Sequence, residues 1–168
     1  VPVIVPGEGA GTSFRVQAAP ILVVGDASEY FSYGAEVAAF LGRAFRFQAF
    51  QLEAGFRVAA SGVVPASSSA DGLFYLGSAG IEARLALPAQ GTFRLIARIG
   101  GGPSLLVAAP EAGSARAKLL PDCVAGLGLG FEASDSFSLE ADIGLLVLFE
   151  RGLPLFGLEP GIAASWRL

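Results

Sequence analysis

The chain has 168 residues, of which 53% are hydrophobic and 15% are charged, and its 11 Lys and Arg against 15 Asp and Glu give a net charge of −4. This length accommodates one domain, the mean hydropathy of +0.61 excludes an ordinary disordered segment, and the absence of a basic cluster excludes nucleic acid as a partner. With no His and one Cys, the chain cannot form an internal disulfide, a His-ligated metal site or a His-based catalytic pair, and we expect no metal and no cofactor.

The high mean hydropathy indicates a membrane protein, although no run approaches the ~18 consecutive apolar residues of a membrane helix. A closed β-barrel is the other structure that crosses a bilayer, and it spreads its apolar residues over alternate positions. Such alternation recurs along the chain and predicts eight strands. In chain order they cover residues 12–24, 30–41, 48–60, 72–87, 92–108, 116–131, 136–149 and 155–168.

The joints between these segments alternate in length. They are compact after the second, fourth and sixth segments, at residues 42–44, 88–91 and 132–135, and longer after the third and fifth. This rhythm is typical of an up-and-down barrel with tight turns at one end and freer loops at the other. We therefore predict an all-β fold, an eight-stranded antiparallel up-and-down transmembrane β-barrel over residues 12–168, preceded by a periplasmic extension over residues 1–11.

Charged residues keep to one face of each predicted strand. In the seventh segment Leu139, Ile143 and Leu145 share one face, whereas Glu140 and Asp142 share the other. The same rule assigns thirteen charged residues to the inner faces: Arg15, Glu36, Glu53, Arg57, Glu82, Arg84, Arg94, Arg98, Lys118, Asp122, Glu140, Asp142 and Glu159. Because their charges nearly cancel and eight strands enclose space only for side chains, we predict a salt-bridge network that plugs the lumen. A charge-selective ion path is the alternative.

Aromatic residues indicate which face meets lipid. On the uncharged face they gather near both strand ends: Phe14, Phe93, Phe131, Phe137 and Trp166 near one, and Phe31, Tyr33, Tyr75, Phe149 and Phe156 near the other. Two aromatic girdles separated by aliphatic side chains are typical of a membrane barrel. The alternatives are a soluble calyx with its charged face outward and a β-sandwich.

The last segment ends in Ser165-Trp166-Arg167-Leu168. With its eight alternating segments, the chain resembles the small outer-membrane β-barrels of Gram-negative bacteria, typified by the transmembrane domain of outer membrane protein A. The resemblance implies the bacterial outer membrane as location, membrane lipid as surroundings, and the barrel-assembly machinery as a partner that binds the C-terminal strand. Trp166 and Leu168 fit the two signal positions, although Leu168 replaces the usual Phe and Ala163 stands where Gly is common. We expect a monomer.

Catalytic interpretations find little support. Glu140 and Asp142 point the same way, but a narrow barrel offers no cleft for a sugar. The Gly-Leu-Gly-Leu-Gly run at 126–130 lacks the dinucleotide-loop spacing and is interpreted as lumen-facing glycine that leaves room for Arg side chains. Enzymes of similar barrel size rely on a His base, and only Lys118 with Asp122 would remain here. We therefore predict a non-enzymatic barrel with a structural role in the envelope or interactions through its loops.

Four prolines lie inside predicted strands, where they cannot donate to a ladder: Pro20, Pro103, Pro121 and Pro160. The first and eighth strands close the barrel and the fifth and sixth form a hairpin, so the prolines form two pairs, each at a strand seam. Several inward positions toward the outer end are also apolar, including Phe74, Leu76, Leu120, Leu146 and Leu148. These features predict either bulges with ordinary packing, or a cup for a small hydrophobic molecule with sideways passage through weakened seams.

Overall fold

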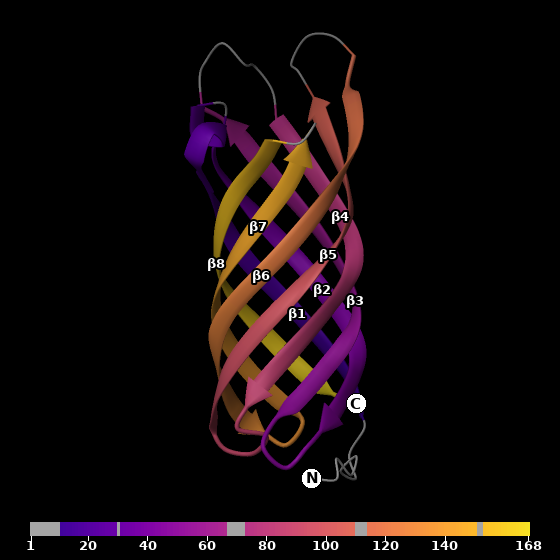
Figure 1. Ribbon diagram of the computed structural model, residues 1–168, viewed down its shortest axis with the longest axis vertical. Coiled ribbons are helices and arrows are strands. Elements are labelled where there is room, and N and C mark those ends of the chain that lie inside the picture. The colour runs from indigo at the N-terminus through magenta and orange to yellow at the C-terminus, as the bar shows by residue number, and fades with distance from the viewer. Residues whose placement is uncertain (1–10, 30, 67–72, 110–113, 151–152) are drawn as a thin grey trace.

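The computed structural model describes residues 11–29, 31–66, 73–109, 114–150 and 153–168, so the predicted extension lies outside the described residues except for Gly11. The strands are β1 (Gly11–Val24), β2 (Phe31–Arg46), β3 (Gln51–Pro65), β4 (Leu73–Leu87), β5 (Phe93–Ala109), β6 (Arg116–Ser134), β7 (Phe137–Glu150) and β8 (Leu153–Arg167), with a 3-10 turn, η1 (Gly25–Glu29), after β1. Each strand pairs antiparallel with the next, and β8 pairs with β1. The predicted eight-stranded up-and-down barrel is confirmed (Figure 1).

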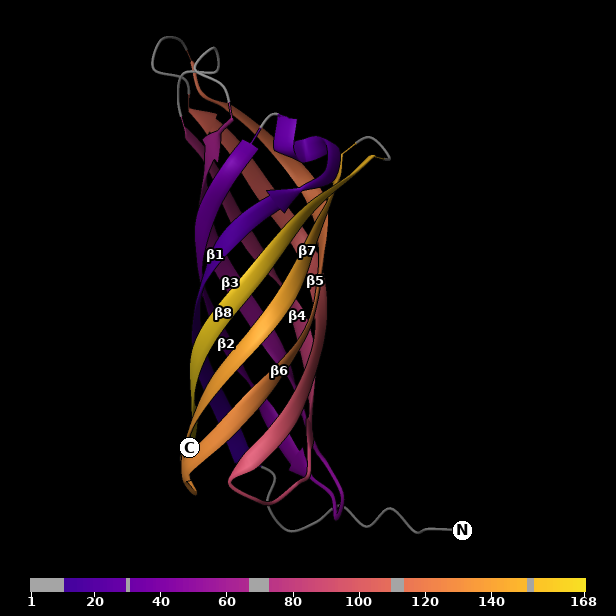
Figure 2. The same ribbon diagram turned by 90° about the vertical axis from the view of Figure 1, so that its left-hand side faces the viewer.

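The two ends of the barrel differ. The turns over residues 47–50, 88–92 and 135–136 lie at one end, called here the turn end, together with the C-terminus (Figure 2). The 3-10 turn η1 lies at the opposite end, the loop end, where β3 and β5 finish and β4 and β6 begin. The strands wind obliquely around the long axis, as closure of a sheet requires.

The predicted turn at residues 42–44 is wrong, because β2 continues through them to Arg46. The chain reverses at residues 47–50 instead, where Phe47 N donates to Phe50 O at 2.8 Å. Gly42 suggested a turn, but inside the strand it makes room: a Cβ there would lie 2.5 Å from the Phe40 ring and 2.6 Å from the Ala54 carbonyl oxygen. A Gly inside a strand often marks such a close approach.

The outer face of the barrel is an apolar belt. Phe56 of β3, Ile81 of β4 and Leu127 of β6 are 73%, 68% and 72% exposed, whereas the inward charged residues are mostly buried. Aromatic residues gather at the turn end, where the Trp166 ring lies 5.8 Å from Phe14. Among the described residues, no helix is long and apolar enough to cross a bilayer. The alternation of the sequence is therefore an alternation between outer and inner faces.

Phe31 departs from the predicted outer girdle. The pairing of β2 with β3 shifts register between Phe31 and Gly34. An extra residue in one strand reverses the face on which the following side chains lie. The Phe31 ring consequently packs edge-on against Phe74 inside the barrel, with 4.9 Å between ring centroids.

Candidate functional site

The middle of the lumen contains ion pairs that converge on Glu82 of β4. The Glu82 side chain is fully buried and pairs with Arg15 of β1. The same carboxylate lies 3.6 Å from Arg57 Nε and 3.8 Å from Arg98 Nη1. Arg57 pairs in turn with Glu36 of β2, whose second oxygen accepts from a serine of β3 at 3.3 Å. Five strands are joined across the lumen by these contacts alone.

Arg98 of β5 extends this central cluster to the other side of the barrel. Its Nε donates to Asp142 Oδ2 at 2.6 Å, and its Nη2 lies 4.0 Å from Glu159 Oε2. Glycines on the facing strands leave the space it occupies, since a Cβ at Gly144 would lie 2.5 Å from Arg98 Nη2 and one at Gly126 would lie 2.8 Å from Arg98 Nε. The ion pairs thus connect three arginines with four carboxylates: Arg15, Arg57 and Arg98 with Glu36, Glu82, Asp142 and Glu159.

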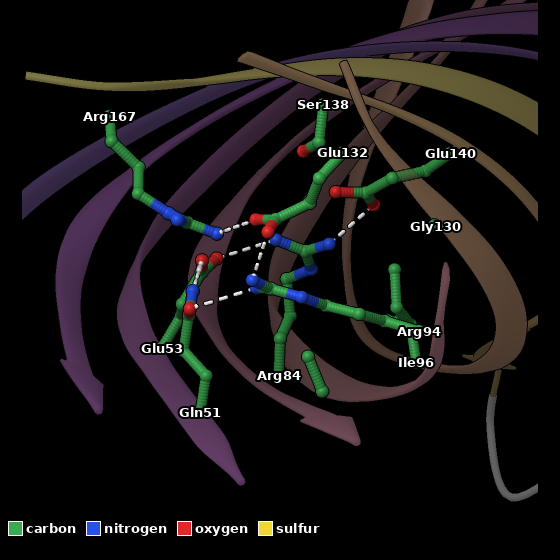
Figure 3. A pocket seen from close by; sticks show the side chains of 11 residues that line it. Gln51, Glu53, Arg84, Arg94, Ile96, Gly130, Glu132, Ser138, Glu140 and Arg167 are labelled. Carbon is green, nitrogen blue, oxygen red and sulfur yellow. Dashed lines mark hydrogen bonds and ion pairs between the residues drawn. The ribbon is translucent and has the colours of Figure 1, made fainter. Parts of the chain in front are cut away.

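A second group of ion pairs lies toward the turn end (Figure 3). Arg84 of β4 bridges Glu53 of β3 and Glu140 of β7. Glu140 also accepts from Ser165 Oγ of β8 at 2.7 Å, and Glu53 accepts from Gln51 Nε2 at 2.7 Å. Every oxygen of these two carboxylates therefore has a donor.

Arg94 and Arg167 share Glu132 at the turn end, and Arg94 Nη1 also donates to Gln51 Oε1 at 3.0 Å (Figure 3). The cavity among these residues measures about 20 Å³, which is the space of a water molecule. Glu132 and Arg167 are missing from the predicted network. Glu132 was assigned to a turn, but β6 continues through it to Ser134, and this is a property of strand length rather than of residue type.

Two predicted members lie apart from these groups. Lys118 pairs with Glu150 near the loop end, where both side chains are 39% exposed. Asp122 accepts from Ser104 Oγ and, at 2.8 Å, from the Gly102 backbone nitrogen. Twelve of the thirteen predicted residues thus take part in ion pairs, and Asp122 is the exception among the described residues.

Above the central cluster the lumen becomes apolar. A cavity of about 80 Å³ lies there, lined on many sides by aliphatic and aromatic groups. Of the five predicted cup residues, Phe74, Leu76, Leu146 and Leu148 line it, whereas Leu120 is buried without reaching it. Lining residues also come from both sides of the β1–β8 seam: Ile21, Val23, Leu155, Phe156 and Gly157.

The ladder between β1 and β8 is interrupted beside this cavity. Pairing runs to Ala18 opposite Ile162 and resumes at Leu22 opposite Leu158, so Pro20 and Pro160 face each other in the gap. Antiparallel pairs alternate between those that exchange two hydrogen bonds and those that exchange none. Both donors of one exchanging pair are missing here, and the seam loses both bonds at one point. Figure 2 shows β8 lying along β1.

The other proline pair behaves differently, and the predicted weak seam between β5 and β6 is wrong. Pro103 and Pro121 face each other, but the β5–β6 ladder is continuous through them. In a strand, each residue directs its N–H to one neighbouring strand only. The N–H groups that these two prolines lack would have been directed away from the β5–β6 ladder, toward the strand on the other side of each. The β4–β5 ladder accordingly breaks opposite Pro103, between Ser78 and Ile81.

Comparisons with known proteins identify the fold. The chain superposes on Neisserial surface protein A with a TM-score of 0.68 and 13% identity, covering 96% of this chain and 100% of that one. For Ail, the attachment invasion locus protein of Yersinia pestis, the TM-score is 0.63 with 14% identity, over 95% and 99% of the two chains. The N-terminal β-barrel domain of Pseudomonas aeruginosa OprF gives 0.57 with 11% identity, over 95% and 100%.

No family profile matches the chain, and no curated protein matches it. The chain has the fold of the small bacterial outer-membrane β-barrels, and the predicted resemblance is confirmed at that level. At these identities the likeness concerns the fold. The described residues contain no group of three or more Cys, Asp or Glu placed to hold a metal ion.

Proposed function

We propose that the chain is a non-enzymatic, monomeric barrel of the bacterial outer membrane whose lumen is closed to ions. The observation that carries this proposal is the connected set of ion pairs across the middle of the lumen. A buried charge must be paired or hydrated, and pairs that join five strands across the lumen support a path closed to ions. Such a barrel serves the envelope structurally or presents its loops to partners.

Conductance in planar bilayers tests the closed lumen. The unmodified protein should give no steady current, because the ion pairs block the path. The double variant Glu82→Ala/Arg98→Ala should raise conductance, whereas Lys118→Ala/Glu150→Ala should leave it unchanged. Both doubles remove one cation and one anion, but only the first pair lies in the central cluster. Large steady currents from the unmodified protein would contradict the proposal.

The C-terminal strand supports the proposed partnership with the barrel-assembly machinery. Leu168 is 80% exposed at the turn end, and its backbone nitrogen donates to Thr12 O at 2.9 Å. Leu168→Ala should slow assembly into vesicles that contain the purified machinery and leave unassisted folding unchanged. Leu127→Ala, at another exposed leucine far from the terminus, is the matched control. Equal effects of the two substitutions would argue against a terminal signal.

The apolar cavity favours a second function, binding of a small hydrophobic molecule in the upper lumen. At about 80 Å³ it is smaller than the ~150 Å³ cavity that holds benzene, so it accommodates one end of a ligand rather than a whole one. The interrupted β1–β8 ladder adjoins the cavity and is the seam through which we propose sideways entry. Pro20 and Pro160, rather than Pro103 and Pro121, mark that entrance.

Titration with decan-1-ol in lipid nanodiscs tests the cup, with leucine methyl resonances as the readout. Methyl groups of Leu76 and Leu146 should shift and saturate, because both line the cavity. Methyl groups of the lipid-facing Leu127 and Leu139 report partition of the alcohol into the bilayer and should change without saturation. Leu146→Glu should weaken binding without unfolding the barrel. The absence of saturable shifts up to millimolar alcohol would leave the cup as ordinary packing.

A further inference from the structure

Glu159 is a buried carboxylate of the lumen that accepts no hydrogen bond from the described residues. Its side chain is fully buried, and neither carboxylate oxygen has a hydrogen-bond partner among the described residues. The nearest cationic atom is Arg98 Nη2 at 4.0 Å, and Arg98 already donates through Nε to Asp142 at 2.6 Å. A buried carboxylate without hydrogen bonds is costly unless something else supplies further positive charge or donors.

The surroundings of Glu159 add further negative charge. The central cluster connects three arginines with four carboxylates, so it carries one uncompensated negative charge. Beside Glu159 on β8, the facing Pro20 and Pro160 have no N–H, and the carbonyl groups of that pair lose their ladder donors. Both oxygens of Glu159 therefore remain available as hydrogen-bond acceptors.

Glu159 also lies next to the cavity wall, on its turn-end side. Gly157, two residues earlier on the same inward face of β8, lines the cavity floor, as do Ile21 of β1 and Leu146 of β7. The residue opposite Glu159 on β7 is Gly144, and a Cβ there would lie 3.3 Å from Glu159 Oε2. Two positions next to Glu159, Gly144 on the paired strand and Gly157 in the cavity wall, thus have no side chain.

We propose that the cavity binds hydrophobic molecules that carry a cationic, multi-donor end such as a primary ammonium, with that end seated on Glu159 and the apolar part in the cup. An ammonium brings one positive charge, three donors and no acceptor, which complements a carboxylate without hydrogen-bond partners in a cluster with one excess negative charge. The carboxylate that lines the cavity near the loop end, Glu150, is already paired with Lys118. This inference rests on the proposed hydrophobic cup and names its ligand class.

Three probes with the same chain length test the ligand class: decylammonium, decan-1-ol and decanoate, each titrated in nanodiscs of zwitterionic lipid with the Leu76 and Leu146 methyl groups as the readout. The unmodified protein should bind decylammonium at least tenfold more tightly than decan-1-ol, and decanoate most weakly. Glu159→Gln keeps the shape of the side chain and should abolish the preference while leaving the alcohol affinity unchanged. Glu150→Gln is the matched control and should retain most of the preference.

A second variant keeps the test independent of Glu159 itself. Gly157→Ala would place a Cβ 3.1 Å from Ile21 Cγ2 at the cavity floor, and it should reduce decylammonium affinity more than decan-1-ol affinity. Equal affinities for the alcohol and the ammonium in the unmodified protein would overturn the proposed ligand class and leave the cup intact. If none of the three probes gives saturable shifts, the proposed cup itself is wrong.

Discussion

Two buried glutamates of the central cluster are predicted to respond differently when their charge is removed. The side chains of Glu82 and Glu159 are both fully buried, and both lie within 4.0 Å of Arg98. Glu82 is the carboxylate paired with Arg15 and lies 3.6 Å from Arg57 as well. Glu82→Gln therefore leaves Arg15 buried without an anion, and breaking a buried pair in this way costs about 3–5 kcal/mol.

Glu159→Gln should have the opposite consequence. Neither oxygen of Glu159 accepts a hydrogen bond from the described residues, so the amide loses little that the carboxylate had. It also removes one charge from a cluster in which carboxylates outnumber arginines. We expect a free energy of unfolding that is unchanged or higher by about 1 kcal/mol, as when poorly compensated buried charges are neutralised.

Urea titrations of the protein in lipid vesicles measure both variants. Trp166 is the only tryptophan and stacks near Phe14 at the turn end, so its emission follows folding into the bilayer. The Gln substitutions are isosteric, and a difference of about 3 kcal/mol or more between them isolates the pairing of each carboxylate. Similar losses in both variants would refute the reasoning, because burial alone would then set the cost.

Three further predictions concern the outer face and the lumen glycines. Ile143→Arg, at a 64% exposed position in the middle of β7, should lower the free energy of unfolding by about 2–4 kcal/mol. The control Ala133→Arg, near the turn end, should lower it by under about 1 kcal/mol. Equal losses in the same urea titration would place the apolar belt outside the lipid. Gly144→Ala should destabilise the protein by about 1–3 kcal/mol because its Cβ would lie 2.5 Å from Arg98 Nη2. A Cβ at Gly77 would have no heavy atom within 4 Å, so the control Gly77→Ala should be nearly neutral. The reverse order would show that Gly144 does not make room for Arg98. The protein should need detergent and migrate differently on gels before and after boiling, and a monodisperse monomer in plain buffer would disprove the membrane assignment.

Much of the barrel could be predicted from alternation alone. Side chains of a strand point to opposite faces with a period of two, so the positions of Arg15, Glu82 and Arg98 relative to their apolar neighbours already assign them to one face. The apolar character of Phe74, Leu76 and Leu146 on that same face likewise indicated a change from a charged to an apolar lumen toward one end. These properties depend on each segment by itself, and they need no knowledge of the partner strand.

Other features depend on two strands at once, and only the tertiary structure decided them. The sequence predicted a turn at Gly42 and an outward Phe31, because it contains neither the crossing of β2 with β3 nor the register shift between them. The sequence predicted that the four prolines form two pairs, but it did not show which neighbouring strand loses the hydrogen bonds that their missing N–H groups would donate. That depends on the alternation of hydrogen-bonded and non-hydrogen-bonded pairs in each ladder. Ion-pair partners such as Arg84 and Glu140, 56 positions apart in the chain, are likewise set by the tilt and closure of the barrel. A strand by itself fixes the face of each side chain, whereas register, closure and the width of the lumen fix what that side chain meets.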